Sequence, residues 1–310
     1  MSTELSYTVE EVSQLLKVSK LTIYDLVKKG DLPVFRVGRQ MRIDAKDLEN
    51  YIQTTKTNRS KVVPSPMAQP SHVAPKFSAI VISGQDLVLD VLGKHVEKNS
   101  AYQALRSYTG SLNSLISMYN GDVDIVSLHL FDGDSDEYNL PYVKKILVGQ
   151  PYIVLNLISR QAGLYVQRGN PLNIQSWMDM KRKQVKLVNR EKGSGARILL
   201  DEQLRINDIS AQSIDGYHHI ETSHLSVASA VSTGAANVGV GIEKAAKIVG
   251  IDFIPLITER YDLVILKTDE NKQLIQNVKD ILSSEPFQTE INSLGDYNLS
   301  QMGQIMHETF

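Results

Sequence analysis

The sequence predicts an α/β protein in which a small winged helix-turn-helix module precedes a larger body of alternating strands and helices. Two short helical patterns and a hairpin pattern fill residues 1–55. A segment that holds four of the ten prolines follows at 56–76. From 77 to 310, short apolar runs alternate with amphipathic stretches, which is typical of α/β layers around a largely parallel sheet.

Composition excludes several classes of protein. The 310 residues include no cysteine, which excludes disulfides, thiolate catalysis and cysteine-based zinc sites and favours a cytoplasmic location. The N-terminus lacks the basic and apolar regions of a secretory signal. The longest apolar stretch, 146–158, is too short and too broken to span a bilayer, and we interpret it as strands. Residues 1–61 carry a net charge of +3 and residues 62–310 a net charge of −5. The positive charge of the N-terminal part suits binding to the phosphates of a nucleic acid.

A capping box is predicted at the start of the first helix. Thr8 is the expected N-cap and Glu11 its partner at the third helical position. Val12, Leu15 and Leu16 then follow the spacing of one helical face. We therefore expect a short helix that packs through these three side chains.

A second helix is predicted after a tight turn. Ser19 can cap it, and Ile23, Leu26 and Val27 form its apolar face. The run Lys-Lys-Gly at 28–30 is a typical helix end, with cations in the last turn and glycine after it. Two short helices joined in this way indicate a helix-turn-helix.

A β-hairpin, the wing, is predicted next. Its strands are 34–37 and 40–43, with Gly38 at the bend, and Asp44 can cap a third helix. The hairpin carries three basic side chains that can reach phosphates or the minor groove, Arg36, Arg39 and Arg42.

Residues 8–44, TVEEVSQLLKVSKLTIYDLVKKGDLPVFRVGRQMRID, resemble the excisionase-like, MerR-related helix-turn-helix 17 family. The resemblance implies that the second helix enters the major groove of DNA while the wing arginines contact the backbone. The exposed candidates on that helix are Ser19, Lys20, Thr22, Tyr24 and Lys28. The alternative is a protein-interaction module, or basic residues that only solvate a face.

The segment 56–76 is expected to be a semi-extended linker with polyproline II character. Such a linker either lets DNA-binding heads adjust their spacing or acts as a passive tether.

Glycine and serine recur where strands of the body give way to helices. The pattern appears at Ser83-Gly84, at Gly110-Ser111 and at Gly193-Ser194-Gly195, with Thr222-Ser223 as a looser case. Free backbone N–H groups, hydroxyls and helix dipoles at such positions can bind an oxyanion. Each position taken alone is equally an ordinary helix N-cap, but the repetition at the carboxyl ends of strands favours a ligand site.

The body resembles the PBP-like, type 2 periplasmic-binding-protein superfamily, in particular its molybdate-binding branch. The residues that carry the resemblance are GSLNSLISMYNGDVDIVSLHLFD at 110–132, GLYVQRGNP at 163–171, VNREKGSGARILLDEQL at 188–204, SHLSVASAVSTGAANVGVGIEKAA at 223–246 and DFIPLITERYDLVI at 252–265. The resemblance implies two lobes that close on a ligand about a hinge. Lobe 1 would take about 77–160 and 261–310, and lobe 2 about 161–260.

The same resemblance implies the ligand-binding residues. Lobe 1 would hold the anion through Ser83 and Ser111 beside Gly84 and Gly110, and lobe 2 through Ser194 with the amides of Gly195 and Ala196 after Gly193. Second contributors would be Arg190, Arg197, Thr222 and Tyr261. Two positions depart from the family pattern, because Ala196 and Ser223 stand where threonine is common. The loss of one hydroxyl donor could alter the preferred ligand.

We expect neither a metal site nor catalysis. The spacing of His218, His219, Glu221 and His224 matches no metal-binding pattern. No pair of nucleophile and base and no nucleotide-binding loop is recognised, so no catalytic residue and no cofactor is predicted.

The first hypothesis is a one-component transcription regulator that senses a small oxyanion, most readily molybdate or tungstate, and reads a two-fold operator as a homodimer. A second is a binding protein for the anion or for a molybdenum-cofactor precursor, without regulatory DNA binding. A third keeps the regulator and changes the ligand to sulfate, phosphate or an organic anion.

Overall fold

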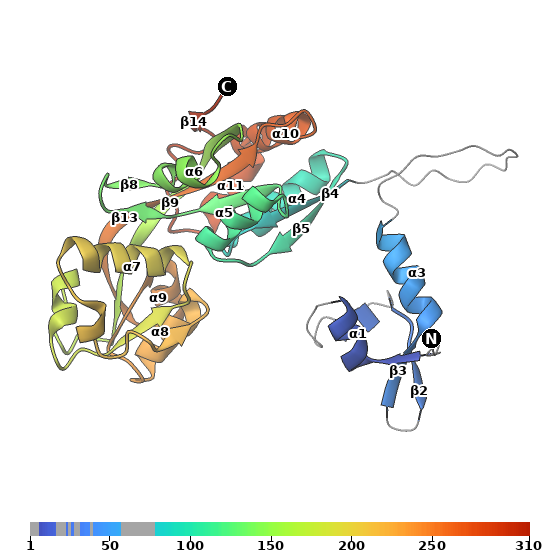
Figure 1. Ribbon diagram of the computed structural model, residues 1–310. Coiled ribbons are helices and arrows are strands. Elements are labelled where there is room, and N and C mark those ends of the chain that lie inside the picture. The colour runs from blue at the N-terminus through green and yellow to red at the C-terminus, as the bar shows by residue number, and fades with distance from the viewer. Residues whose placement is uncertain (1–5, 17–22, 24–25, 28–31, 38–39, 57–77) are drawn as a thin grey trace, which may run out of the picture. The chain divides into compact units, whose positions relative to one another are not determined.

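The structure is a computed structural model that describes residues 6–16, 23, 26–27, 32–37, 40–56 and 78–310. The chain divides into two compact units, Met1–His72 and Val73–Phe310, which are taken one at a time (Figure 1). The predicted linker at 56–76, apart from its first residue, and most of the predicted second helix lie outside the described residues. Lys56, predicted as linker, is the last residue of a helix.

The N-terminal unit has the elements of a winged helix-turn-helix. These are β1 (Ser6–Thr8), α1 (Val9–Leu16), β2 (Phe35–Val37), β3 (Gln40–Asp44) and α3 (Ala45–Lys56). The predicted hairpin is confirmed, because β2 and β3 pair antiparallel, and β1 adds a third strand on the other side of β3. The capping box is also confirmed. The Thr8 amide donates to Glu11 Oε2 at 2.7 Å, and the Glu11 amide donates to Thr8 Oγ1 at 3.2 Å.

The small core of this unit follows the predicted helical faces with one exception. Val12 and Ile23 are fully buried, and Leu16, Leu26 and Val27 pack around them. Leu15, predicted on the same face, is 59% exposed. The prediction for Leu15 is wrong. The helix spans only two turns, and the core contacts a narrower face of it than the face that Val12, Leu15 and Leu16 define together.

The C-terminal unit alternates strands and helices as expected. Its strands are β4 (Ser78–Ser83), β5 (Tyr102–Ser107), β6 (Ile125–Leu128), β7 (Phe131–Asp132), β8 (Glu137–Tyr138), β9 (Tyr152–Val166), β10 (Leu187–Arg190), β11 (Ile220–Glu221), β12 (Val238–Ile242), β13 (Asp252–Leu266) and β14 (Ile305–Glu308). Its α-helices are α4 (Val88–Asn99), α5 (Ser111–Asn120), α6 (Leu140–Ile146), α7 (Gly195–Ile206), α8 (His224–Ser232), α9 (Glu243–Val249), α10 (Lys272–Ser283) and α11 (Glu285–Ser293), with short 3₁₀ turns at Trp177–Lys181 and Ala211–Ser213.

The sheet of this unit is mixed, which corrects the expectation of a largely parallel sheet. Its order is β11-β10-β12-β9-β13-β6-β4-β5, with β14 also on β9. The outer pairs, such as β4–β5 and β10–β12, are parallel. The two central strands β9 and β13 are antiparallel and stay paired from Asp252↔Val166 to Leu266↔Tyr152. These long strands run through both halves of the unit and join them.

Helices pack around the two ends of this central ribbon and form two lobes (Figure 1). Lobe 1 contains α4, α5, α6, α10 and α11, and lobe 2 contains α7, α8 and α9. The β7–β8 hairpin packs with lobe 2, because Phe131 and Tyr138 belong to the core beneath α7. Among the described residues, no helix has the length and apolar character needed to cross a membrane.

Candidate ligand-binding cleft

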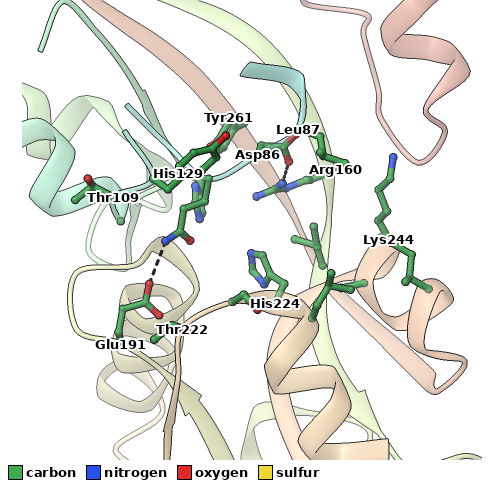
Figure 2. A pocket seen from close by; sticks show the side chains of 18 of the residues that line it. Asp86, Leu87, Thr109, His129, Arg160, Glu191, Thr222, His224, Lys244 and Tyr261 are labelled. Carbon is green, nitrogen blue, oxygen red and sulfur yellow. Dashed lines mark hydrogen bonds and ion pairs between the residues drawn. The ribbon is translucent and has the colours of Figure 1, made fainter. Parts of the chain in front are cut away.

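A pocket of about 650 Å³ lies between the two lobes (Figure 2). Lobe 1 lines it with the loops after β4, β5 and β6, and lobe 2 lines it with the loop after β10 and the starts of α8 and α9. Arg160 and Tyr261 reach it from the central strands β9 and β13. This is the cleft position that suits a ligand held by two closing lobes.

A buried ion-pair cluster lies where the cleft meets the central strands. Arg160 and Glu259 are cross-strand partners, and Arg160 Nε donates to Glu259 Oε1 at 2.5 Å. Arg160 Nη1 pairs with the carboxylate of Asp86 from lobe 1. Asp86 also accepts from the Val88 amide at 2.9 Å and from the Tyr297 hydroxyl at 3.0 Å. The cluster fixes the guanidinium of Arg160 at the pocket wall.

Two histidines face the same pocket. His129 follows β6. Its Nδ1 atom lies 3.2 Å from Ser111 Oγ, and its ring packs against the ring of Tyr261. His224 is the first residue of α8, and its buried Nδ1 has no hydrogen-bond partner among the described residues. Burial, and then the charges of Arg160 and Arg190, lower the pKa of each imidazole well below its ordinary value.

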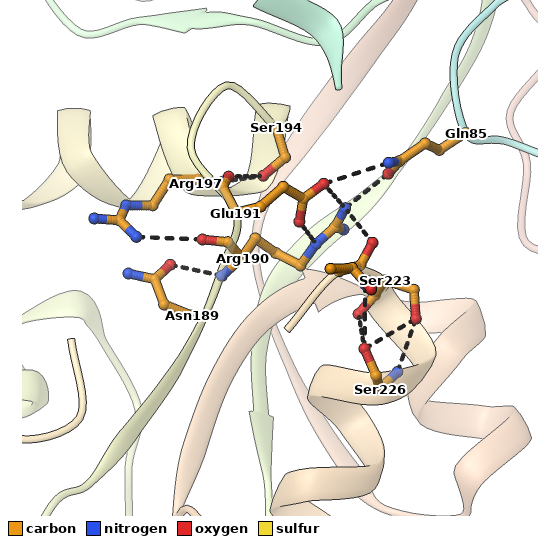
Figure 3. Close-up of polar contacts among 9 residues, drawn as sticks. Gln85, Asn189, Arg190, Glu191, Ser194, Arg197, Ser223 and Ser226 are labelled. Atoms are coloured by element: carbon orange, nitrogen blue, oxygen red, sulfur yellow. Dashed lines mark hydrogen bonds and ion pairs between the residues drawn. The ribbon is translucent and has the colours of Figure 1, made fainter. Parts of the chain in front are cut away.

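A second arginine links the lobes across the cleft (Figure 3). Arg190 Nη2 donates to Gln85 Oε1 at 2.7 Å, and Arg190 Nε donates to Glu191 Oε2 at 2.8 Å. Gln85 Nε2 in turn donates to Glu191 Oε1 at 3.3 Å. Although burial alone would raise the pKa of Glu191, its bonds to Arg190 and the charge of that arginine lower it. Gln85 comes from lobe 1 and the other two residues from lobe 2, so the triad holds the cleft closed on this side.

Lys244 closes the cleft from α9. Its Nζ donates to the carbonyl of Leu294 at 2.6 Å and lies 4.6 Å from the ring centre of Tyr297. One turn later, Lys247 Nζ lies 2.5 Å from Asp296. Helix α9 of lobe 2 therefore contacts the segment that follows α11 of lobe 1.

The starts of α5 and α7 meet directly. The Leu112 amide of lobe 1 donates to the carbonyl of Gly193 in lobe 2 at 3.0 Å. A Cβ on Gly110 would lie 2.9 Å from the same carbonyl oxygen and 3.0 Å from the Ser194 nitrogen. Only glycine at 110 lets the two lobes approach this closely.

Gly110→Ala is therefore expected to stop the lobes from closing fully. The φ of −66° at Gly110 suits alanine, so the cost comes from the contact between lobes and not from backbone strain. We expect a loss of about 1–3 kcal/mol in the free energy of unfolding. We also expect a longer distance between spin labels on Lys98→Cys and Ser229→Cys, positions that are exposed on opposite lobes of a chain without other cysteines. Gly121→Ala, at the other end of α5 with no atom within 4 Å, should cost stability through its left-handed φ of +82° but leave that distance unchanged.

Four of the residues predicted to bind the ligand line the pocket. These are Gly110, Thr222, Ser223 and Tyr261. Burial raises the pKa of Tyr261 to about 12, and its hydroxyl accepts a hydrogen bond from Ser127 Oγ at 2.8 Å. Ser223 caps α8 through reciprocal bonds with Ser226.

The three serines predicted to hold the anion are bonded within the protein. Ser83 Oγ lies 2.8 Å from Ser114 Oγ, and Ser111 Oγ contacts His129. Ser194 Oγ donates to the Glu191 carbonyl at 3.0 Å and accepts from the Arg197 amide at 3.3 Å. All three are at most 3% exposed, and none of them lines the pocket.

The remaining predicted residues do not form part of the pocket lining. Gly84 packs under Ser127, and Gly195 lies against His129. Ala196 is buried in the core of lobe 2. Arg197 binds Asp201 and stacks on Tyr217, away from the cleft, and Arg190 and Gly193 take part in the lobe contacts described above.

Sequence reasoning missed the residues that carry most of the polar chemistry of the cleft. They are Asp86, His129, Arg160, Glu191 and Lys244, while His224 was placed in the motif of the anion site and was not named as a ligand-binding residue. One signal was available, since an arginine within the apolar run of β9 needs a buried partner. Its partner Glu259 lies 99 residues away and is identified only by the strand register.

Most of the predicted DNA contacts lie outside the described residues. This applies to Ser19, Lys20, Thr22, Tyr24, Lys28 and Arg39. Arg36 lies on β2 opposite Met41, and Arg42 lies on β3 opposite Phe35. Arg42 Nη1 donates to Ser6 Oγ at 3.4 Å, so this side chain also links two strands of the wing sheet.

Both units of the chain are similar to known proteins. Residues 6–56 match the helix-turn-helix domain model. A 48-residue stretch, 16% of this chain, is 48% identical to the putative DNA-binding protein MT0521 of Mycobacterium tuberculosis (strain CDC 1551 / Oshkosh) and covers 62% of it. The fold is similar to a putative phosphate ABC transporter substrate-binding protein with bound phosphate from Clostridium perfringens, with a TM-score of 0.51 and 15% identity over 71% of this chain and 99% of that one.

The whole chain is 49% identical to the uncharacterized protein YvgK of Bacillus subtilis (strain 168), with 100% of both chains covered. Residues 93–283, more than half of the chain, match the PBP superfamily domain model. The chain therefore belongs to the PBP superfamily domain family, and it joins that domain to an N-terminal helix-turn-helix domain.

Proposed function

We propose that this protein is a one-component transcription regulator of the cytoplasm. Its helix-turn-helix unit binds an operator, and its cleft senses a small anionic ligand. The observation that carries the proposal is the cleft itself, where residues of two lobes meet around a pocket on a chain that also has a DNA-binding fold. Because one such small unit covers only part of an operator, the proposed active form is a homodimer on a two-fold site.

The balance of donors and acceptors supports an anionic ligand. The pocket carboxylates already accept hydrogen bonds from the protein. Asp86 accepts from three donors, and Glu191 accepts from Arg190 and Gln85. The pocket also contains hydrogen-bond donors that these carboxylates do not use. Among the described residues, Arg160 Nη2 has no hydrogen-bond partner, and the Lys244 ammonium donates one hydrogen bond to the protein. The start of α8 adds the positive end of a helix dipole. Among the anions considered, sulfate and phosphate are the smallest, molybdate and tungstate are somewhat larger tetrahedral ions, and organic anions are larger still.

Closure of the cleft is the proposed signal. The lobe contacts at Gly110, Gln85 and Lys244 form only when the lobes approach, so a bound ligand that bridges them shifts the closed population. A ligand can shift this equilibrium only by its difference in affinity for the two states.

The proposal is tested by DNA binding of the full chain. Selection from a random duplex library should enrich a two-fold sequence, and fluorescence anisotropy should then give its affinity and salt dependence. Lys20→Ala with Arg39→Ala should weaken binding to all sequences and lower the salt slope by about 1 for each lost phosphate contact. Gly110→Ala, which holds the cleft open, should change operator affinity, whereas Gly121→Ala should not.

Two outcomes contradict the proposal. If no sequence is enriched and binding stays equal on all DNA, the chain is a binding protein and not a regulator. If a sequence is enriched but Gly110→Ala leaves its affinity unchanged, the cleft does not control the DNA-binding unit.

A further inference from the structure

The exposed part of the cleft lining includes a group of apolar side chains. Four large apolar side chains of the pocket lining are also exposed, with 54% for Leu87, 63% for Tyr108, 46% for Leu225 and 63% for Ile248. The first two come from lobe 1 and the last two from α8 and α9 of lobe 2. A single exposed apolar side chain is ordinary, but four that line one pocket from both lobes indicate a binding surface. We call these four residues the apolar rim.

The inner end of the same pocket is polar. Arg160, His129 and Tyr261 line it and are at most 8% exposed. Figure 2 shows Arg160 and His224 pointing toward one another across the pocket. The pocket therefore offers buried hydrogen-bonding groups near the central strands and exposed apolar groups at the rim.

The size of the pocket argues against a bare tetrahedral oxyanion. A volume of about 650 Å³ falls in the range of pockets that enclose organic molecules of drug size. The serine hydroxyls that would hold a tetrahedral ion, those of Ser83, Ser111 and Ser194, are buried and bonded within the protein. An oxyanion alone would leave the apolar rim in contact with water.

The charges around the pocket are balanced. Arg160, Arg190 and Lys244 face Asp86, Glu191 and Glu259, so the cluster carries no excess of positive charge. A ligand with a single acidic group can be met by the unused donors, whereas burial of a doubly charged ion would need further compensation.

We propose that the pocket binds an organic anion whose single acidic group lies at Arg160 and His224 and whose apolar body lies against the apolar rim. This inference deepens the proposed function, since it names the ligand class of the same cleft. Asp86 and Glu259 hold the guanidinium in place, so Arg160 acts as a preorganised donor. Ligand contact with Leu87 on one side and with Leu225 on the other bridges the two lobes.

The test is a series of probes that share one acidic group and differ in apolar length. Straight-chain carboxylates from acetate to octanoate are titrated into the full chain by calorimetry, beside molybdate, tungstate and phosphate. We expect affinity to rise about fourfold for each methylene that reaches the apolar rim. The inorganic anions should neither bind in the cleft nor displace octanoate.

Variants separate the two ends of the pocket. Leu225→Ser with Ile248→Ser should flatten the length dependence and leave the shortest acids unchanged. His224→Gln should weaken every acid by a common factor of about ten, because it alters only the polar end. Val148→Ser with Ile116→Ser, which changes exposed apolar residues elsewhere on lobe 1, is the matched control and should preserve the full series.

A flat series in the native protein overturns the inference, and so does a length dependence that persists in the rim variant. Binding of molybdate or tungstate without the acids also overturns it, while it leaves the regulator proposal intact. Operator binding is measured separately and without ligand, so the failure of either proposal is recognised independently.

Discussion

Replacing Arg160 by glutamine should lower the free energy of unfolding of the C-terminal unit by about 3–5 kcal/mol. Arg160 is 6% exposed and pairs with Asp86 and Glu259, which are 7% and 1% exposed. Removal of the guanidinium leaves two carboxylates buried without a counter-charge. The change is measured by denaturant unfolding followed by circular dichroism at pH 7.

Neutralising the whole cluster is the control for this prediction. Asp86→Asn and Glu259→Gln added to Arg160→Gln should recover most of the lost stability, because the uncompensated charges are gone. Arg205→Gln breaks a partly exposed network with Asp134 and Glu202 and should have a far smaller effect. If Arg160→Gln matches Arg205→Gln in stability, the cluster does not hold the central strands.

The same variant should also lose the binding of organic acids, and the triple variant should not regain it. The triple variant thereby separates stability from ligand affinity. It restores stability, but it still lacks the guanidinium that binding of the acid needs. A triple variant that binds octanoate as the native chain does would show that the acidic group lies elsewhere in the pocket.

Local patterns predicted the N-terminal unit well because its determinants are close in sequence. Thr8 and Glu11 are three residues apart, and the hairpin strands are separated by two residues. The sheet of the body was harder to predict. Strands β9 and β13 are long and nearly continuous in apolar residues, which is typical of buried parallel strands, yet they pair antiparallel through both lobes.

The candidate site was predicted in position and missed in much of its chemistry. The helix starts at Gly110, Ser194 and Ser223 do gather near the cleft, as expected from glycine and serine at the ends of strands. Which hydroxyls remain free depends on side-chain packing within each lobe, and Ser111 is bonded to His129, 18 residues later. The pairing of Arg160 with Glu259 and Asp86 depends on long-range register, which no local pattern contains.

Acid should destabilise the C-terminal unit through its two buried histidines. The unfolded chain binds a proton at each histidine near pH 6.5, whereas in the folded protein burial and the nearby arginines hold the pKa of His129 and His224 well below that value. Below about pH 6.5 the unfolded state therefore binds more protons than the folded state. Stability is fully present above this pH and is lost as the pH falls, by up to about 1.4 kcal/mol per pH unit for His129 and in the same direction for His224.

The slope of the free energy of unfolding between pH 6.5 and 5 identifies these two histidines. Carboxylates such as Glu191 lose their contribution to stability only at lower pH. Denaturant unfolding of the native chain should show this slope, and His129→Gln with His224→Gln should reduce it. His219→Gln, at an exposed position outside the cleft, should leave the slope as it is. An equal slope in the double variant would mean that both imidazoles take up protons in the folded state. The neutral donors and acceptors that His129 and His224 offer at the polar end of the pocket would then be charged, and a single acidic group would meet two additional cations there.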